Sequence, residues 1–588
     1  MLTVENKVTT VFVGNIGIGG NHPIRIQSMT NTPTHHIEKT VNQIITIWKA
    51  GADFVRITIP NTKDLEATKK IKALLTKQNF NIPLVADIHF SPKLAIRAAA
   101  IVDKIRINPG NFAELGNNIP ENEQQAFIRK KVSELIAVCN QYETSIRIGV
   151  NHGSLPERIL QKYGNTAEGM VALTMQYLMI FNDLKFKRVI VSLKSSNPLV
   201  MVYANRLLKR KMIATNLNFP LHIGVTEAGD SDDGRIKSAL GIGTLLQEKI
   251  GSTIRVSLTE PPEKEIPVAK KIICYAKEKT AISSDFKNIT YPEIFSKRKV
   301  SATSLVDFNK YPQVLIAGKN FRQNKSQYIA IDNKNHSYEK TVVPFSEHIT
   351  GIPIFTVNTI DKLSDYSGKD KMLLITFNEI KANILKIKND KLLILIYHLS
   401  DLSPVYEVDA FFDFLKKEKI NNPVIFHKNY TENDLETLQI KVAMDFGRPF
   451  INGYGNGLFI TNHGTINNTA IQQIAYDLLQ ATRMLITKTE YIACPSCGRT
   501  LFDLESTTQK IRKKTAHLKG LKIAIMGCIV NGIGEMADAD YGYVGGTPGK
   551  ISLYKKRKLI KKNIPEENAV DELIKLIKDN GDWQDIHS

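Results

Sequence analysis

Short β-branched segments alternate with helix-like segments through the first 280 residues of this 588-residue chain. Strands that alternate with helices form right-handed crossovers and a parallel sheet. Eight such strands within about 260 residues favour a closed (β/α)8 barrel over an open sheet. We therefore predict a TIM barrel over residues 1–281, closed by a last helix at Pro267–Lys279. The predicted strands are Ile24–Met29, Phe54–Ile59, Pro83–Ile88, Lys104–Asn108, Ser145–Val150, Arg188–Lys194, His222–Thr226 and Thr253–Leu258.

The rest of the chain divides into two further α/β domains. Residues 282–486 form an inserted middle domain with long polar connections and no recognisable chemical motif. Residues 487–588 form a small C-terminal domain with a strand at Leu521–Met526 and a final helix around Ala569–Asn580. The strands expected in the middle domain are Val314–Ala317, Tyr328–Asp332, Met372–Phe377, Lys391–Leu399, Pro423–His427 and Val442–Phe446.

The composition is that of a soluble globular protein, with 43% hydrophobic and 23% charged residues. No apolar run approaches the roughly 18 residues of a membrane span. The N-terminus lacks a basic flank followed by an apolar stretch, so we expect a cytoplasmic protein without a signal peptide. The net charge of +20 attracts acidic partners, which include nucleic acids, phosphorylated metabolites and acidic redox proteins.

Five cations stand inside predicted barrel strands, where a parallel barrel normally has apolar residues. Burying an unpaired cation costs several kcal/mol, and acidic partners on these strands are few, with Asp87 the clearest. A shared external anion at the C-terminal mouth of the barrel explains the pattern better than internal salt bridges. A phosphate or diphosphate ligand suits guanidinium groups, which bind it bidentately. The five cations are Arg56, Arg106, Arg147, Lys194 and Arg255.

Polar residues at the ends of the same strands are further candidates for this site. Glu227 follows the seventh strand, and against a bound anion it is a candidate proton donor or polar anchor. A carboxylate beside several cations should stay ionised unless it is desolvated. Asn151 and Ser257 occupy equivalent strand ends, where ordinary loop hydrogen bonding is the alternative.

Five cysteines in the whole chain are too few for a disulfide scaffold. Three of them cluster in the last 100 residues. Cys494 and Cys497 form a CxxC, Cys528 follows 31 residues later, and Glu535 stands seven residues beyond it. Thiolates at this spacing suit zinc or an iron–sulfur cluster. Three thiolates and a carboxylate would be unusual for structural zinc but reasonable for a 4Fe-4S cluster with one weakly held oxygen ligand. Zinc and the absence of any metal remain open alternatives.

Together these motifs resemble the 4-hydroxy-3-methylbut-2-enyl diphosphate synthase family, in its long three-domain form. The matching segments cover the first 280 and the last 100 residues in the expected order, whereas the middle domain matches only by position and length. The segments are IRIQSMTNT, GADFVRIT, VADIHF, KIRINPGN, SIRIGVNHGSL, GVTEAG, GIGTLL, TIRVSL, TEYIACPSCGRTLFD and IMGCIVNGIGE.

The resemblance implies a role for each candidate residue. Glu227 would be the catalytic carboxylate at the reacting centre. One 4Fe-4S cluster would be held by Cys494, Cys497, Cys528 and Glu535. The cyclic diphosphate substrate would be bound by Arg56, Arg106, Arg147, Asn151, Lys194, Arg255 and Ser257.

The resemblance also implies an activity in isoprenoid precursor biosynthesis by the methylerythritol phosphate pathway. The enzyme would reductively open and dehydrate 2-C-methyl-D-erythritol 2,4-cyclodiphosphate to 4-hydroxy-3-methylbut-2-enyl diphosphate, using two electrons delivered through the cluster. Reduced flavodoxin or ferredoxin would donate them, and the basic segment Lys555–Lys562 is a hypothetical docking site for this acidic donor. We expect a homodimer, open and closed arrangements of barrel and cluster domain, and neither a membrane nor a nucleic-acid partner.

Two alternative functions follow from the residues alone. One is a non-redox barrel that handles phosphate, such as a pterin-type synthase, with a zinc-stapled tail. The other is a nucleic-acid-binding protein that uses its positive charge. A brown protein with about four irons per chain would indicate the cluster. A colourless protein with zinc would indicate the first alternative, and salt-dependent nucleic-acid binding would indicate the second.

Overall fold

The structure is a computed structural model of the chain. It describes residues 8–88, 90–116, 119–229, 231–281, 297–301, 303, 307–310, 312–317, 328–331, 339–344, 352–366, 368–399, 401, 406–536 and 538–585. The chain divides into two compact units. The first consists of Met1–Ile273 and Lys488–Ser588, and the second of Cys274–Thr487.

The first unit contains the predicted TIM barrel. Its strands pair in parallel in the order β8-β7-β6-β5-β4-β3-β10-β9. A parallel bridge between Val191 and Leu221 brings β8 beside β9, so the sheet nearly closes on itself. All eight strands were predicted, and this part of the fold prediction is confirmed. The strands are β3 (Arg25–Met29), β4 (Phe54–Thr58), β5 (Leu84–Asp87), β6 (Lys104–Ile107), β7 (Ser145–Asn151), β8 (Val189–Lys194), β9 (His222–Ile223) and β10 (Thr253–Ile254).

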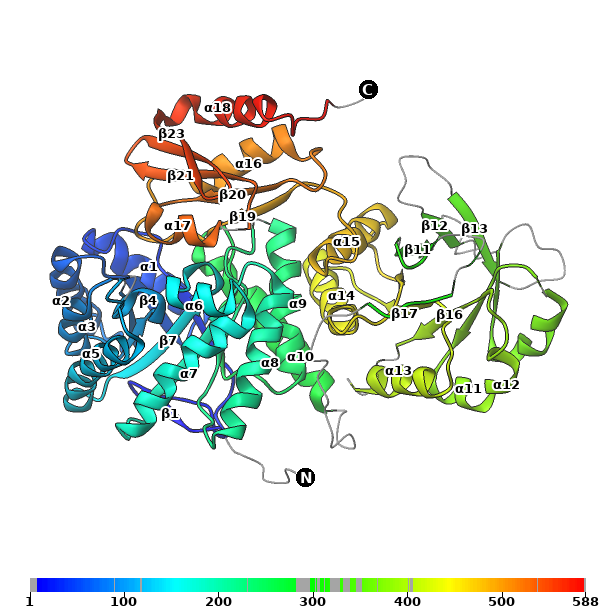
Figure 1. Cartoon of the computed structure of the whole chain (residues 1–588), viewed down its shortest axis with the longest axis horizontal. Helices are drawn as coiled ribbons and strands as arrows, with labels where there is room; N and C mark the ends of the chain where they lie inside the picture. Colours follow the sequence, from blue (N-terminus) through cyan, green and yellow to red (C-terminus); the bar gives the residue numbers. More distant parts are fainter. Residues whose placement is uncertain are drawn as a thin grey trace. The chain divides into compact units, whose positions relative to one another are not determined.

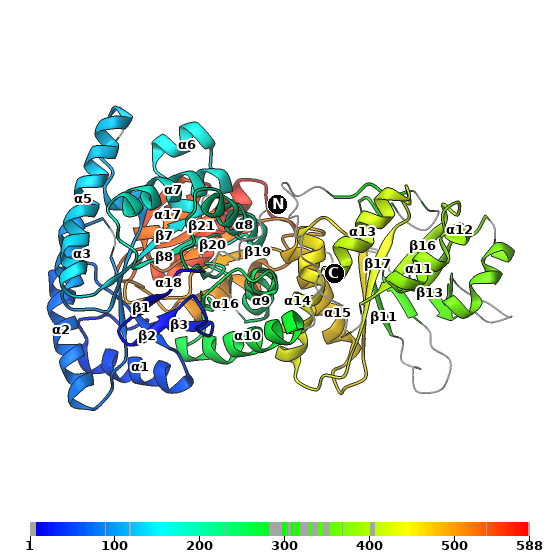
Figure 2. The same cartoon turned by 90° about the horizontal axis from the view of Figure 1, so that it is seen from below.

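Helices cover the outside of this barrel (Figures 1 and 2). Several begin at a side chain that accepts a hydrogen bond from a free backbone N–H group of the first turn, as Asn61 does from Asp64. The α-helices are α1 (Ile37–Ala50), α2 (Thr62–Lys77), α3 (Pro92–Ala99), α4 (Pro109–Phe112), α5 (Glu121–Gln141), α6 (Glu157–Tyr163), α7 (Ala167–Asp183), α8 (Pro198–Ala214), α9 (Ser231–Gln247) and α10 (Glu265–Ala281). Two 3-10 helices, η1 (His152–Ser154) and η2 (Pro262–Lys264), join them.

An antiparallel hairpin closes one end of the barrel. Its strands are β1 (Val11–Val13) and β2 (Ile16–Ile18). Side chains of the hairpin form one apolar cluster with inward-facing residues of β4, β5 and β8, namely Phe54, Val85 and Ile190. The hairpin lies at the end of the barrel opposite the C-terminal segment (Figure 1). Access to the interior is therefore left to the C-terminal ends of the strands.

Residues 488–588 form a small α/β domain over that open end, which we call the cap. Its five-stranded sheet has the order β19-β20-β21-β22-β23, with the first three strands parallel and the last three antiparallel. Helix α17 faces the barrel (Figure 1), and α16 and α18 pack on the opposite face of the sheet. The elements are β19 (Glu490–Ala493), α16 (Leu504–Thr515), β20 (Lys522–Met526), α17 (Ile529–Glu535), β21 (Tyr541–Thr547), β22 (Lys550–Lys555), β23 (Lys558–Pro565) and α18 (Glu566–Asp579).

The second unit is itself a closed barrel of β11 to β18, with an apolar interior. The strands are β11 (Gln313–Ala317), β12 (Tyr328–Ile331), β13 (Glu339–Pro344), β14 (Ile352–Phe355), β15 (Lys371–Ile375), β16 (Leu393–His398), β17 (Val424–Tyr430) and β18 (Gly457–Asn462). The helices are η3 (Val357–Tyr366), α11 (Phe377–Ala382), α12 (Ile384–Ile387), α13 (Glu407–Lys417), α14 (Leu435–Ile451) and α15 (Asn468–Ala481). The α/β class is confirmed, but barrel closure was not predicted.

One strand predicted in this unit is wrong. Val442–Phe446 lies inside helix α14. Leu438, Val442 and Phe446 are all buried at a spacing of four residues, which is a helical period that the short apolar segment concealed. Among the described residues, no helix combines the length and apolarity that crossing a bilayer requires.

Candidate active site

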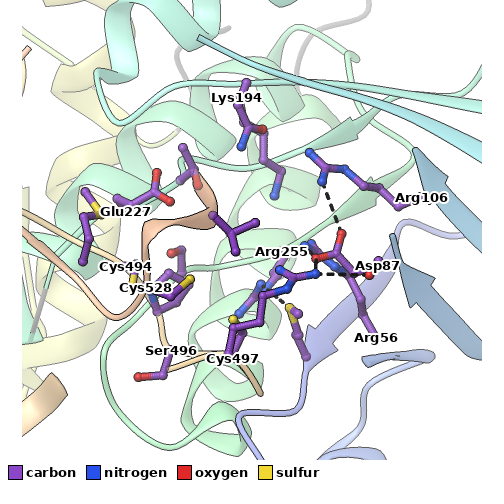
Figure 3. Close-up of a pocket in the computed structure, with 18 of the residues that line it drawn as sticks. Arg56, Asp87, Arg106, Lys194, Glu227, Arg255, Cys494, Ser496, Cys497 and Cys528 are labelled. Atoms are coloured by element: carbon purple, nitrogen blue, oxygen red, sulfur yellow. Dashed lines mark hydrogen bonds and ion pairs between the residues drawn. The ribbon is translucent and has the colours of Figure 1, made fainter. Parts of the chain in front are cut away.

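A cavity lies where the C-terminal ends of the first barrel's strands meet the cap (Figure 3). Eleven of the twelve predicted site residues line it: Arg56, Arg106, Arg147, Asn151, Lys194, Glu227, Arg255, Ser257, Cys494, Cys497 and Cys528. Glu535 is the exception. Segments separated by more than 200 residues of sequence therefore contribute to one cavity.

Asp87 is the centre of a charge cluster on one wall. Its carboxylate, which is almost fully buried, forms ion pairs with Arg56 at 3.0 Å and Arg106 at 3.3 Å. Arg499 of the cap forms a third at 3.1 Å and also donates to the Asp87 carbonyl oxygen. Figure 3 shows Asp87 between Arg56 and Arg106. One negative charge among three guanidinium groups leaves this wall strongly positive.

Arg255 has an internal partner that the sequence did not reveal. Glu265, at the start of α10, accepts from its guanidinium group at 3.0 and 3.2 Å. Burial lowers the pKa of Arg255, but the charge and hydrogen bonds of Glu265 outweigh it and leave the pKa raised. The expectation of an external anion as the partner of every strand cation therefore fails at Arg255, which is neutralised within the fold.

Of the five predicted strand cations, Arg147 and Lys194 have no carboxylate partner among the described residues. Both are buried, and the Nε and Nη1 atoms of Arg147 have no hydrogen-bond partner in the described structure. Burial lowers the pKa of Arg147, and the charge of Arg56 lowers it further. Burial likewise lowers the pKa of Lys194, with Arg147 as the next cause. A bound polyanion would relieve both effects.

Gly149 on β7 makes room for the guanidinium group of Arg106. A Cβ atom on Gly149 would lie 2.6 Å from the Nε atom of Arg106, closer than side chains tolerate. The Arg106 Nη2 group donates to the Gly149 carbonyl oxygen at 3.0 Å. The guanidinium group therefore lies directly across the backbone of the neighbouring strand, where any larger residue would displace it.

Glu227 occupies a strained loop after β9. Its φ of +43° lies in the left-handed region, which non-glycine residues rarely adopt. The next residue, Ala228, forms a parallel β-bridge with Ala493, which directly precedes Cys494. Cap docking is thus tied through the backbone to the position of Glu227. Burial raises the pKa of Glu227, which favours its protonated form.

Glu535 ends helix α17 and faces the barrel. The Asn151 amide donates to its carboxylate at 2.6 Å, and burial, followed by the charge of Glu227, raises the pKa of Glu535. A Cβ atom on Gly534 would meet the carbonyl oxygen of Gly153 at 2.0 Å. Glycine at both positions lets the backbones of η1 and α17 touch, which brings Glu535 to Asn151. Glu535 itself does not line the cavity that holds the thiols.

The three thiols come from two loops of the cap. Cys494 follows β19 and accepts from the Gly527 N–H group at 3.3 Å, and Cys528 precedes α17. Burial raises the pKa of Cys494, whereas Cys497 lies near the positive charges of Arg255 and Arg499. No three His, Cys, Asp or Glu side chains in the described part of the chain converge on one metal position. Three thiols that line one cavity are a donor set that would suit an iron–sulfur cluster.

Ion pairs join the cap to the barrel beside this cavity. Asp233, in the first turn of α9, binds Lys488 at 2.8 Å through one carboxylate oxygen and Arg512 at 2.8 Å through the other. Lys237, one turn later, lies 3.5 Å from Glu490. Together with the Ala228 bridge, these contacts fix the cap over the loop that carries Glu227.

Lys555–Lys562, the hypothetical docking segment, begins at the opposite end of the cap sheet from the cysteines. Lys555 pairs with Tyr541, which pairs with Ile523, and Cys528 lies five residues beyond Ile523. This places the Lys555 end about 17 Å from the cysteines along the strand direction. Its role in docking stays a prediction.

Missed site residues have recognisable reasons. Arg499, two residues after the CxxC, was not predicted because it lies far from the barrel in sequence. Glu265 lies outside every predicted strand and two residues before the predicted closing helix Pro267–Lys279. Of the two cysteines away from the site, Cys139 is buried and Cys274 is exposed.

The fold and the cavity define a class: TIM-barrel proteins whose cationic mouth is covered by a thiol-bearing α/β cap. Residues 8–270 match the GcpE TIM-barrel domain, and residues 490–579 match the GcpE protein C-terminal domain. The chain belongs to the family of 4-hydroxy-3-methylbut-2-en-1-yl diphosphate synthases, which confirms the family predicted from the sequence.

Similar proteins cover the chain almost from end to end. A relative from Parabacteroides distasonis, the flavodoxin type of this synthase, is 41% identical over 98% of both chains. One of the same type from Porphyromonas gingivalis is 42% identical over 99% of this chain and 98% of its own length. The chloroplastic ferredoxin type from Arabidopsis thaliana is 37% identical over 99% of this chain and 88% of its own length.

Similar solved structures are distant. An N-acetylneuraminic acid synthetase from Leptospira borgpetersenii matches with 15% identity, covering 49% of this chain and 94% of its own, at a TM-score of 0.31.

Proposed function

We propose that this protein reductively opens and dehydrates 2-C-methyl-D-erythritol 2,4-cyclodiphosphate to 4-hydroxy-3-methylbut-2-enyl diphosphate. The observation that carries the proposal is one cavity lined by buried arginine side chains, Lys194, the desolvated carboxyl group of Glu227 and three thiols. An anionic substrate and a thiol-bound redox centre would meet there. The family to which the chain belongs supports the same reaction.

Substrate binding falls to the cationic wall. Arg147 and Lys194, which lack carboxylate partners among the described residues, hold the diphosphate most directly. Arg56 and Arg106 add charge that Asp87 only partly neutralises. The Ser257 hydroxyl is buried without a partner in the described structure and can donate to a phosphate oxygen. These groups stabilise the negative charge that grows on the diphosphate as its ring bond breaks.

Cys494, Cys497 and Cys528 would hold a 4Fe-4S cluster, with Glu535 as an exchangeable fourth ligand. When bound, the cluster would pass two electrons from the donor, one at a time, and would supply a Lewis-acidic iron. Glu227 holds a proton at its buried carboxyl group and gives it to the hydroxyl that leaves as water. Asn151 holds the Glu535 carboxylate at the barrel side through its amide. Closure of the cap excludes bulk water from these groups.

The electron donor is a flavodoxin or ferredoxin, the donors printed in the names of the relatives. The protein works in the cytoplasm, in keeping with five cysteines that form no disulfide bonds. It forms a homodimer. These assignments rest on the family and on composition, and each is testable with purified protein.

Anaerobic turnover with an artificial reductant tests the reaction. We expect Cys528→Ser to lose both activity and iron, because a thiolate ligand is removed. Glu227→Gln should keep its iron and brown colour but lose at least 100-fold in kcat, the order expected for loss of a proton donor. Cys274→Ser is the matched control, because this exposed thiol lies outside the cavity, and it should keep both.

The proposal fails if the anaerobic wild type binds zinc instead of iron. It fails equally if a fully loaded, folded protein does not turn over the cyclodiphosphate, or if Glu227→Gln matches wild type. Iron loss in Cys274→Ser but not in Cys528→Ser would refute the assignment of the ligands.

A further inference from the structure

A second group of buried polar side chains lies inside the first barrel, outside the set that lines the cavity. Gln27 on β3, Lys104 on β6 and His222 on β9 are each no more than 1% exposed. The Gln27 amide atoms, the Lys104 Nζ atom and the His222 Nε2 atom have no hydrogen-bond partner in the described structure. Buried polar atoms are normally satisfied, so this concentration calls for a ligand.

Strand geometry places Lys104 one layer deeper than the cavity. Lys104 and Arg106 are two residues apart on β6, so both side chains face the barrel interior. Arg106 lines the cavity, and Lys104 lies about 7 Å further from the mouth. The Lys104 ammonium group stands 4.3 Å from the ring centroid of Phe54, which belongs to the apolar cluster closed by the β1–β2 hairpin. An apolar floor thus lies beneath a buried cation.

Arg147 contributes to the same layer from above. It pairs in register with Arg106 on the adjacent strand, and its Nε and Nη1 atoms are buried without partners in the described residues. The pKa of Lys104 is lowered first by burial and then by Arg147, so the two cations lie within electrostatic reach. Asp53, the carboxylate that most favours the charged Lys104, already accepts from Arg25 and from the Ile26 N–H group.

His222 completes the group as a neutral donor. Its Nδ1 atom forms a short hydrogen bond with the Thr253 hydroxyl. Burial lowers the pKa of His222, and the nearby cations lower it further, so the ring is neutral. With the hydroxyl donating to Nδ1, the proton of the ring sits on Nε2, which is then a free donor. The N–H groups of Lys104, Arg147 and Gln27 and the His222 ring thus share one buried layer, in which the Gln27 Oε1 atom also has no partner among the described residues.

We propose that this interior layer binds a small monovalent inorganic anion of the halide class, held by Lys104, Arg147, His222 and the Gln27 amide. A spherical anion accepts from several N–H donors at once without needing a donor of its own. It keeps Lys104 protonated in an apolar surrounding, where an unpaired charge would otherwise cost several kcal/mol. The site lies one layer below the diphosphate cavity, and Arg147 borders both.

Bromide in the crystal is the direct test. Full-length protein is crystallised with bromide as the only halide, and data are collected at the bromine absorption edge. We expect an anomalous peak within hydrogen-bonding distance of the Lys104 Nζ atom. A water molecule without anomalous signal at that position, or a peak confined to the upper cavity, overturns the proposal. A tetrahedral oxyanion there overturns the halide assignment.

Thermal unfolding gives an independent readout that needs no turnover. At matched ionic strength, we expect a higher unfolding midpoint in bromide or chloride than in gluconate. An anion present at about 100 times its dissociation constant should raise the midpoint by about 2–4 °C. Lys104→Met should abolish this difference, and the exposed Lys63→Met should keep it. Equal midpoints of wild type in all three salts overturn the proposal, even where Lys104→Met does not fold.

Discussion

At the scale of single residues, burial shifts the pKa values of side chains away from their ordinary values. His427 on β17 shows this in the second unit. It is 6% exposed, its Nδ1 atom lies 3.0 Å from that of His398, and its ring packs against Phe459. Burial, followed by the charge of His398, lowers the pKa of His427 to about 3. The folded protein therefore keeps this imidazole neutral across the whole physiological pH range.

This shift predicts a pH dependence of stability. Below about pH 6.5, His427 binds a proton in the unfolded chain but stays neutral in the folded protein. The free energy of unfolding therefore falls as the pH falls from about 6.5 towards 3. The slope contributed by this group approaches about 1.4 kcal/mol per pH unit. In urea unfolding of the full chain, His427→Gln should flatten this dependence for the second unit, whereas exposed His36→Gln should not. An unchanged slope in His427→Gln would contradict the assigned pKa.

The candidate site could be predicted at this scale because its residues break a strong rule. Cations such as Arg147 and Lys194 stand in strands that should be apolar, and three cysteines stand close together in a chain with few. The partners of those cations could not be predicted. Arg255 pairs with Glu265 and Asp87 gathers Arg499 only through tertiary contacts. Lys104 was not predicted as a site residue, although it lies two residues before Arg106 on the same strand and therefore faces the same side.

At the scale of elements, α9 joins the cap to the barrel. Asp233 binds Lys488 and Arg512 from the cap, one through each carboxylate oxygen. Its position in the first turn of α9 also suits a negative charge at a helix N-terminus. This turn follows the strained loop of Glu227 by only a few residues, so the ion pairs control how firmly that loop is held.

Asp233→Asn should loosen the cap without unfolding it. It removes one charge from two partly buried pairs, at an expected cost of about 1–3 kcal/mol. We expect kcat/KM to fall at least tenfold while iron content stays normal, and Asp233→Glu to restore part of the activity. The neighbouring Asp232→Asn is the control, because Asp232 takes no part in these two ion pairs. Equal kinetics of the two asparagine variants would exclude the positioning role.

Periodic patterns made the first barrel predictable, since each of its strands is short, β-branched and followed by a helix. The elements that failed lacked such a signal. The β1–β2 hairpin has strands of three residues, and α14 presents its helical period within a segment that also reads as a strand. Closure of the second barrel depends on pairing between β11 and β18, which are far apart in sequence.

At the scale of the whole molecule, the net charge of +20 dominates encounters with acidic proteins. Such a field speeds association with a negatively charged donor and is screened by salt. We expect kcat/KM for reduced flavodoxin to fall steeply between low and physiological ionic strength, while turnover with a small uncharged reductant changes little.

Neutralising Lys556, Arg557 and Lys558 together should weaken this salt dependence if the basic segment docks the donor. An unchanged dependence in that variant would assign docking to another face of the molecule. A flavodoxin rate that does not respond to salt in the wild type would contradict electrostatic steering altogether.

Arg499 has a thermodynamic consequence for ligand capture. It pairs with Asp87 only while the cap is docked on the barrel, so docking adds one guanidinium group to the cavity. A dianion must then bind the docked arrangement more tightly than the undocked one. By linkage, the incoming metabolite itself shifts the balance towards the sealed form.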